Sequence, residues 1–184
     1  MRITIKQILS FTILFIVCSC ALIAFAKTKY SKPKHKLPCQ IEPQTKKVLP
    51  KGNAGCLIHQ DGKLVFVDEG SGYNSPGGTA KKKELAWQTA CRETNEEVFG
   101  GDPNVTIKVG RLLGNLKGRF YVYECSVDKD KLSQVLEKGW GRDGEPTNPR
   151  KIKVRLFNPK KLAPKKWRFQ NQKKDLVKML KLIE

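Results

Sequence analysis

Hydrophobic and polar positions divide the chain into a long apolar start, a basic stretch and a series of strand-like and helix-like segments. Asn53–Gln60 and Lys63–Asp68 are apolar-rich and are joined by Asp61-Gly62, a dipeptide typical of a hairpin turn. Further strands are predicted over 105–113, 120–127 and 151–157. The pattern therefore predicts a sheet built from short strands.

Helices are predicted over 82–98 and 171–182, and 131–138 is expected to form a short helix or a turn. The first has no helix breaker and is followed by Gly100-Gly101-Asp102-Pro103, which is expected to end it. Glu69–Ala80, with its many glycines, and Trp140–Pro149 are expected to be loops. Strands with one helix in the middle and one at the end predict an α+β fold or a mixed α/β sandwich.

The first 26 residues predict an N-terminal secretory signal. Arg2 and Lys6 precede an apolar run that ends in Ala24-Phe25-Ala26, and small residues at 24 and 26 fit a signal-peptidase site. The length of the run also fits a retained membrane anchor. We therefore expect a signal peptide or anchor at 1–26, a basic linker at 27–50 and a folded domain at 51–184. The expected location is exported, either periplasmic or secreted, with membrane anchoring as the alternative.

Four cysteines remain beyond the predicted signal, namely Cys39, Cys56, Cys91 and Cys125. An even number in an oxidising compartment favours one or two disulfides, and two bridges could pair in three ways. Four buried free thiols are the alternative interpretation.

The charge balance predicts anionic partners. Lys and Arg number 36 against 17 Asp and Glu, which gives a formal charge of +19. Such an excess attracts phosphorylated molecules, nucleic acid or an anionic membrane surface. No nucleic-acid motif and no aromatic platform for single strands accompany it, so no specific nucleic-acid partner is predicted.

Three carboxylates in the first helical segment indicate a metal site. Glu93, Glu96 and Glu97 are spaced so that they project toward one side of a helix. Like charges this close destabilise a helix unless a cation compensates them, and hard oxygen ligands favour Mg²⁺ or Mn²⁺. The preceding Gly77-Gly78 would let a backbone carbonyl approach the same ion.

This constellation resembles the signature of the Nudix hydrolase family, G-x5-E-x7-R-E-U-x-E-E-x-G-U with U a bulky aliphatic residue. The matching positions are Gly78, Glu84, Arg92, Glu93, Glu96 and Glu97. Two positions depart from it, because Thr94 replaces the aliphatic residue and Gly100 comes one place late. Tyr73–Gly78 is similar to the family's lead-in to the signature. Residues 110–114, 119–123 and 140–157 look like the diphosphoinositol polyphosphate branch, which also cleaves dinucleoside polyphosphates.

The resemblance implies an α/β/α sandwich with a mixed curved sheet and metal-dependent hydrolysis of a diphosphate linkage. The implied substrate is a nucleoside polyphosphate, a dinucleoside polyphosphate or a diphosphoinositol-type compound. The implied metal ligands are Glu93, Glu96, Glu97 and the carbonyl of Gly78. Arg92 and Glu84 would form an ion pair that braces the helix, with a phosphate contact as the alternative for Arg92. The general base stays open among Glu96, Glu124, Asp143 and Glu145.

Basic and aromatic residues near the implied pocket are candidates for binding an anionic phosphorylated small molecule. They are Tyr73, Lys81, Arg111, Arg119, Arg150, Lys151 and Lys153. Alternation along the last predicted strand places Lys151 and Lys153 on one face, where a solvated surface is the other interpretation. Tyr73 could stack on a base, or pack at the rim or in the core. The alternative function is a cationic module that binds polyanions or membranes on a catalytically weak Nudix scaffold.

Overall fold

The computed structural model describes residues 39–43, 50–143, 150–163, 166–168 and 172–183. The predicted signal segment 1–26 and most of the predicted linker lie outside these residues. Within the described part of the chain, no helix is long and apolar enough to cross a membrane.

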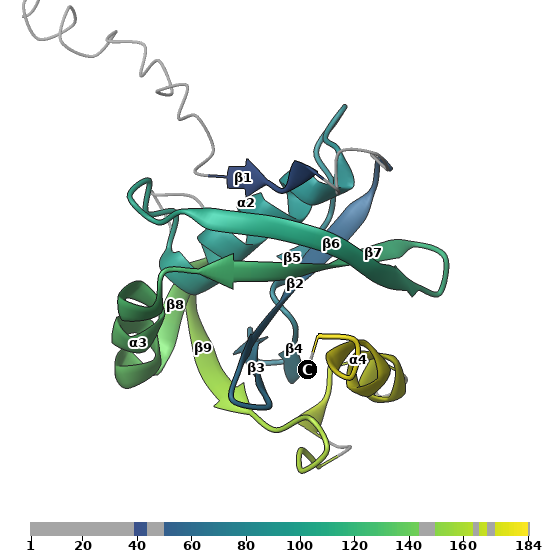
Figure 1. Cartoon of the computed structure of the whole chain (residues 1–184). Coiled ribbons are helices and arrows are strands. Elements are labelled where there is room, and N and C mark those ends of the chain that lie inside the picture. The colour runs from purple at the N-terminus through teal and green to yellow at the C-terminus, as the bar shows by residue number, and fades with distance from the viewer. Residues whose placement is uncertain (1–38, 44–49, 144–149, 164–165, 169–171, 184) are drawn as a thin grey trace, which may run out of the picture. The chain divides into compact units, whose positions relative to one another are not determined.

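The described strands form one mixed sheet in the order β1-β6-β7-β2-β3-β9-β8 (Figure 1). Their bounds are β1 Cys39–Ile41, β2 Asn53–Gln60, β3 Lys63–Asp68, β6 Ile107–Leu116, β7 Phe120–Val127, β8 Trp140–Asp143 and β9 Arg150–Phe157. Two short strands lie beside this path, β4 (Tyr73–Asn74) on β3 and β5 (Gly77–Gly78) on β2. The pairs β1–β6 and β2–β7 are parallel, and the other described pairs are antiparallel. The mixed sheet, together with the three helices of the described residues, confirms the predicted fold class.

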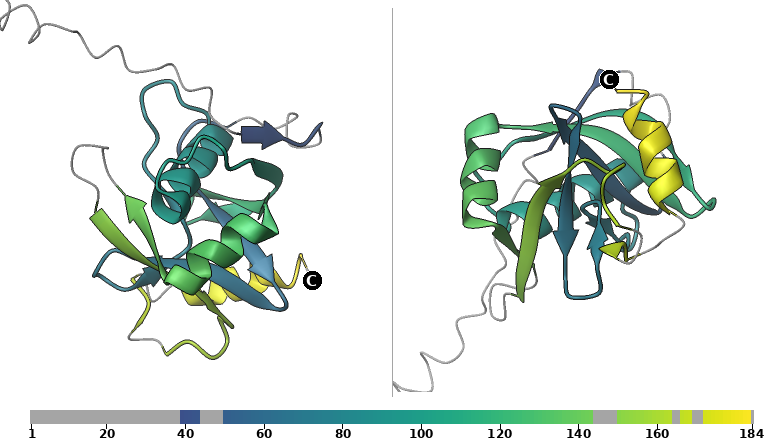
Figure 2. Two further views of the ribbon diagram at one scale, coloured as in Figure 1. Left: turned by 90° about the vertical axis from the view of Figure 1, so that its left-hand side faces the viewer. Right: turned by 90° about the horizontal axis from the view of Figure 1, so that it is seen from below.

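Helices cover both faces of the sheet, because its strands bury side chains on both sides. Ala54, Cys56 and Ile58 of β2 join the core beneath α2 (Ala86–Phe99) and α3 (Lys129–Lys138). Leu57 of the same strand joins a second core beneath α4 (Gln172–Leu180). Alternation along a strand explains this division, since neighbouring residues point to opposite faces. Figure 2 shows α3 and α4 at opposite sides of the strands.

The predicted hairpin at Asp61-Gly62 is confirmed. Gln60 and Lys63 pair across the turn, and both turn residues have positive φ angles, 51° at Asp61 and 66° at Gly62. Two left-handed residues produce the turn that suits the natural twist of a hairpin.

The predicted helix 82–98 begins later than expected, at Ala86. The backbone amide of Glu84 donates to the carbonyl of Lys81 (3.0 Å), and the amide of Lys81 donates to the Glu84 carboxylate (2.8 Å). Lys83 takes a left-handed φ of 69° inside this turn. The closed turn holds these residues out of the helix. At the other end Gly100, with φ 66°, caps α2 as predicted.

Two segments predicted to lack strand structure form strands at the ends of the sheet. Cys39–Ile41, in the predicted linker, pairs in parallel with Ile107–Val109 of β6. Trp140–Asp143, in the predicted loop, pairs with Arg150–Lys153 of β9. Neither segment carries a strand pattern of its own, and both depend on pairing with a neighbouring strand.

Two disulfides cross-link the domain, so the free-thiol interpretation is wrong. Cys39–Cys91 ties β1 to α2, and Cys56–Cys125 ties the parallel strands β2 and β7 together. Both bridges agree with an oxidising compartment. The Cys39–Cys91 bridge thus links an end of the sheet to the helix that carries the candidate metal ligands.

Candidate active site

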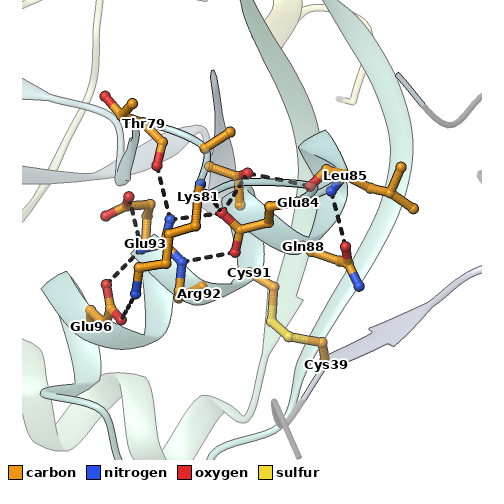
Figure 3. Close-up of polar contacts among 12 residues, drawn as sticks. Cys39, Thr79, Lys81, Glu84, Leu85, Gln88, Cys91, Arg92, Glu93 and Glu96 are labelled. Atoms are coloured by element: carbon orange, nitrogen blue, oxygen red, sulfur yellow. Dashed lines mark hydrogen bonds and ion pairs between the residues drawn. A yellow bond between two sulfur atoms is a disulfide. The ribbon is translucent and has the colours of Figure 1, made fainter. Parts of the chain in front are cut away.

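Arg92 lies at the centre of a network of ion pairs on α2 (Figure 3). Its guanidinium binds the Glu84 carboxylate through two hydrogen bonds, of 2.8 Å from Nε and 3.0 Å from Nη2. Nη1 contacts Glu93 Oε1 at 2.9 Å and Glu96 Oε2 at 2.8 Å. Nη2 also donates to the carbonyl of Thr79 (3.0 Å). The network fastens the helix to the glycine-containing loop before it, as the resemblance implied.

The side chains of the Glu84–Arg92 ion pair are largely buried, so the pair is part of the folded interior rather than a surface contact. The Arg92 side chain is 8% exposed and that of Glu84 is 10% exposed. Burial raises the pKa of Glu84, but hydrogen bonds from Arg92 and from the Lys81 amide outweigh it and hold the pKa below its ordinary value. Burial lowers the pKa of Arg92, whereas Glu84 and the neighbouring glutamates raise it above its ordinary value. Both groups therefore stay charged at neutral pH.

Two glycines of β5 let the backbone approach the carboxylates of α2. The amide of Gly77 donates to Glu97 Oε2 (2.8 Å), which fixes that carboxylate against the loop. A Cβ at Gly78 would lie 2.6 Å from the carboxyl carbon of Glu93. A Cβ at Gly77 would lie 2.5 Å from the Cα of Gly55. Larger residues at either position would displace the carboxylates or the strand.

A pocket of about 460 Å³ opens where these carboxylates meet the ends of the parallel strands β2 and β7. Its described lining residues are Asn53, Glu69, Asn74, Gly77, Gly78, Thr79, Glu93, Glu97, Phe120, Arg168 and Gln172. Asn53 is the first residue of β2 and Phe120 is the first residue of β7. The two residues pair across the strands and therefore lie side by side. The pocket therefore combines carboxylates, backbone groups, amides and one aromatic ring.

The chemistry of this pocket fits a hard divalent cation. Glu93 and Glu97 face it together with the backbone of Gly78, and carboxylate and carbonyl oxygens are the ligands that Mg²⁺ and Mn²⁺ prefer. Three carboxylates and one guanidinium line it, a formal excess of two negative charges. A phosphorylated substrate would be repelled unless a cation offset that charge. Among the described residues, no three acidic, histidine or cysteine side chains converge as a ligand set.

Glu96 takes a different position from the other two implied ligands. Its carboxylate binds Arg92 and lies 3.5 Å from the ammonium of Lys81, and its side chain is 33% exposed. Glu96 is absent from the described lining of the pocket, which holds Glu93 and Glu97. The structure thus places two of the three predicted carboxylates on the pocket, and Arg92 bridges the third, Glu96, to Glu93. The Lys81 side chain, 67% exposed, is close to the site through Glu96.

The remaining predicted substrate residues lie away from the described lining of this pocket. Tyr73 packs edge-on against Phe157 (4.9 Å between ring centroids) beside the second hydrophobic core, as the packing alternative holds. Arg111 pairs with Glu124 (2.8 Å) on strands β6 and β7. Lys151 lies over the Trp140 ring, with its ammonium 4.6 Å from the ring centroid. The others, Arg119, Arg150 and Lys153, are exposed. Their roles in binding stay predictions.

The predicted alternation along the last strand is confirmed, with Lys151 and Lys153 exposed and Ile152 and Val154 buried between and beside them. Among the candidates for general base, Glu124 is paired with Arg111 and is not among the described residues that line the pocket. Glu145 and the side chain of Asp143 lie outside the described residues.

Sequence reasoning missed the residues that reach the pocket from distant parts of the chain, which are Asn53, Glu69, Asn74, Phe120, Arg168 and Gln172. The one available signal was positional, because Asn53 and Phe120 begin predicted strands. Arg168 had no such signal. It is the only basic residue among the described residues that line the pocket.

The two departures from the signature leave the site geometry in place. Thr94 is fully buried, as the aliphatic residue would be, although its hydroxyl has no hydrogen-bond partner among the described residues. Gly100 ends the helix in a left-handed conformation, and its amide donates to the carbonyl of Glu96 (3.1 Å). The shifted glycine therefore still caps the helix.

Comparison with known proteins agrees with this geometry. The NUDIX domain profile matches residues 49–180. An ADP-ribose pyrophosphatase from Streptococcus suis aligns with a TM-score of 0.51 at 18% identity, covering 73% of this chain and 92% of that one. A UDP-X diphosphatase aligns with a TM-score of 0.50 at 18% identity, covering 77% of this chain and 66% of that one. No curated protein sequence matches significantly.

At this identity the solved structures establish a shared fold. The profile match spans most of the chain and includes every residue of the α2 network and the pocket. The chain belongs to the NUDIX domain family, and this membership supports its assignment as a pyrophosphohydrolase.

Proposed function

We propose that this protein hydrolyses a diphosphate linkage in a phosphorylated small molecule, with Mg²⁺ or Mn²⁺, at the pocket formed by α2 and β5. The observation that carries the proposal is the placement of Glu93, Glu97 and the Gly77-Gly78 backbone around one cavity. Family membership supports the same reaction. The proposed substrates are nucleoside polyphosphates, dinucleoside polyphosphates and diphosphoinositol-type compounds.

Glu93, Glu97 and the carbonyl of Gly78 would hold the metal, with Glu96 as the third carboxylate. When bound, a divalent cation would neutralise phosphate oxygens and lower the pKa of an attacking water. The excess negative charge of the pocket supports this need for a cation, because the substrate itself is strongly anionic.

The chain's own residues orient these groups before substrate arrives. The amide of Gly77 holds Glu97, and Arg92 holds Glu93 and Glu96 on the same helix. Glu84 fixes Arg92 in turn through two hydrogen bonds. Preorganised charges of this kind need no rearrangement during the reaction, which is how an active site lowers a barrier electrostatically. Glu96, partly exposed and next to Lys81, is our choice for the residue that accepts a proton from water.

The proposal is tested by incubating the full chain with a substrate and Mg²⁺ or Mn²⁺ and measuring the phosphate or nucleotide that hydrolysis releases. The substrates would be ATP, ADP-ribose, a dinucleoside tetraphosphate and a diphosphoinositol phosphate. Metal-dependent turnover that falls at least 100-fold in Glu97→Gln would support the proposal. The matched control is Glu137→Gln, the same change at an exposed position of α3. If the folded protein hydrolyses none of these substrates but still binds polyanions, the alternative function of a cationic binding module would be favoured instead.

A further inference from the structure

Basic residues are abundant in this protein, but few of them line the pocket. The whole chain carries a formal charge of +19, whereas the described lining of the pocket has Glu69, Glu93 and Glu97 against Arg168 alone. A cation near Glu93 and Glu97 would compensate those two carboxylates. Any additional negative charge on the substrate would then meet Arg168, the one basic residue among the described residues that line the pocket.

Arg168 is held in place by its backbone rather than left on a loose loop. Its amide donates to the carbonyl of Tyr73 (3.0 Å), and the preceding Trp167 forms a bridge with Tyr73. Trp167 is 4% exposed and packs edge-on against Phe66, with 5.2 Å between ring centroids. A buried aromatic anchor therefore sets the position from which the guanidinium of Arg168 faces the pocket.

The partner of Arg168 is equally well positioned. Glu69 Oε1 lies 2.9 Å from Nη1 of Arg168. Glu69 begins a tight loop in which the Asp68 carboxylate accepts hydrogen bonds from the amides of Gly70 (2.8 Å) and Gly72 (3.0 Å). Gly72 then touches the other segment so closely that a Cβ there would lie 2.9 Å from the Arg168 amide nitrogen. Backbone contacts therefore fix the two segments from which Glu69 and Arg168 reach the pocket.

The Glu69–Arg168 pair is weak enough to exchange for a substrate group. Arg168 is 35% exposed and Glu69 is 32% exposed at the side chain, so water screens the pair. Pairs of this exposure contribute little to stability. A phosphate with two or more oxygens can accept parallel hydrogen bonds from a guanidinium, which makes it a stronger partner than a single carboxylate oxygen.

We propose that Arg168 determines substrate choice by binding a phosphate beyond the hydrolysed diphosphate, which it exchanges for Glu69. The preferred substrates are then compounds with three or more phosphates rather than diphosphates without a further anionic group. This inference rests on the proposed function, since it concerns the same pocket. It differs from the sequence-based expectation, which assigned substrate binding to Tyr73, Lys81, Arg111, Arg119, Arg150, Lys151 and Lys153.

The experiment compares ATP with ADP-ribose as substrates for the full chain, because only ATP carries a third phosphate. Arg168→Ala should lower kcat/KM for ATP about 10- to 100-fold, mainly through KM, and change kcat/KM for ADP-ribose less than about threefold. Arg168→Lys should recover part of the loss. Glu69→Gln should raise kcat/KM for ATP, because position 69 then no longer competes for the guanidinium with a negative charge.

The control is Lys174→Ala, which removes one positive charge from an exposed position of α4. It should leave the ratio of the two kcat/KM values unchanged. Equal losses for ATP and ADP-ribose in Arg168→Ala, or a Glu69→Gln variant as impaired as Arg168→Ala, would overturn the inference and mark the pair as a structural brace. Absence of hydrolysis of every substrate by the unmodified protein would instead contradict the proposed function, so the two failures are distinguishable.

Discussion

Arg92→Met removes the guanidinium that compensates a buried carboxylate. Glu84 is 10% exposed and would keep only the hydrogen bonds from the Lys81 amide (2.8 Å) and the Thr89 hydroxyl (3.1 Å). Breaking a buried ion pair by removing one partner costs about 3–5 kcal/mol. With a urea dependence of about 2 kcal/mol per molar, the unfolding midpoint should fall by about 1.5–2.5 M.

A second change separates lost charge compensation from lost packing. Glu84→Gln in the Arg92→Met background removes the stranded charge, and the amide oxygen can still accept from the Lys81 amide. The double variant should therefore be more stable than Arg92→Met alone, by about 1–3 kcal/mol. Urea unfolding of the four proteins in the cycle, with both disulfides intact, measures this. Additive losses, with the double variant the least stable, would refute the reasoning that charge compensation is the function of Arg92.

Three further predictions concern single features of the fold. Thr94→Val should raise the free energy of unfolding by about 1 kcal/mol in thermal or urea unfolding, because it removes a buried hydroxyl without a described partner. Cys39→Ser combined with Cys91→Ser should lower it by about 2–4 kcal/mol, since the bridge closes a loop with a sequence separation of 52. The pKa of Glu84 is lower in the folded protein than in the unfolded chain, where it is about 4.3, so the ionised carboxylate stabilises the fold. This contribution is fully present above about pH 4.3 and is lost as the pH falls through the pKa of the folded state. Unfolding measured between pH 2 and 7 should therefore show a shallower acid loss in Glu84→Gln.

Local pattern predicted much of the fold, because most elements carry their own signal. The β2–β3 hairpin follows from Asp61-Gly62, and the end of α2 follows from Gly100. The strands β1 and β8 could not be predicted in this way, since each depends on pairing with a partner that is distant in the sequence. The start of α2 was misplaced because the Glu84 side chain closes a turn that helical spacing does not reveal.

The residues of the candidate site also divide into those that a local sequence pattern predicts and those that depend on contacts between distant segments. The α2 carboxylates and Arg92 are close in sequence, so their spacing alone indicates a shared function. Phe120 and Arg168 reach the pocket through strand pairing and the Trp167 anchor, neither of which leaves a local pattern. Charge counting also did not identify Arg168 as the basic residue of the pocket, because exposed basic residues such as Lys151 and Lys153 of β9 give the same signal in the sequence.

Binding of Mn²⁺, followed by electron paramagnetic resonance of the free ion, tests most directly whether the pocket between α2 and β5 holds the metal. The full chain should bind Mn²⁺, and combining Glu93→Gln with Glu97→Gln should weaken this binding at least 10-fold while the fold is preserved. Glu137→Gln on α3 should leave it unchanged. Equal Mn²⁺ affinity in the unmodified protein and in the double variant would contradict a metal-dependent hydrolytic centre at this pocket.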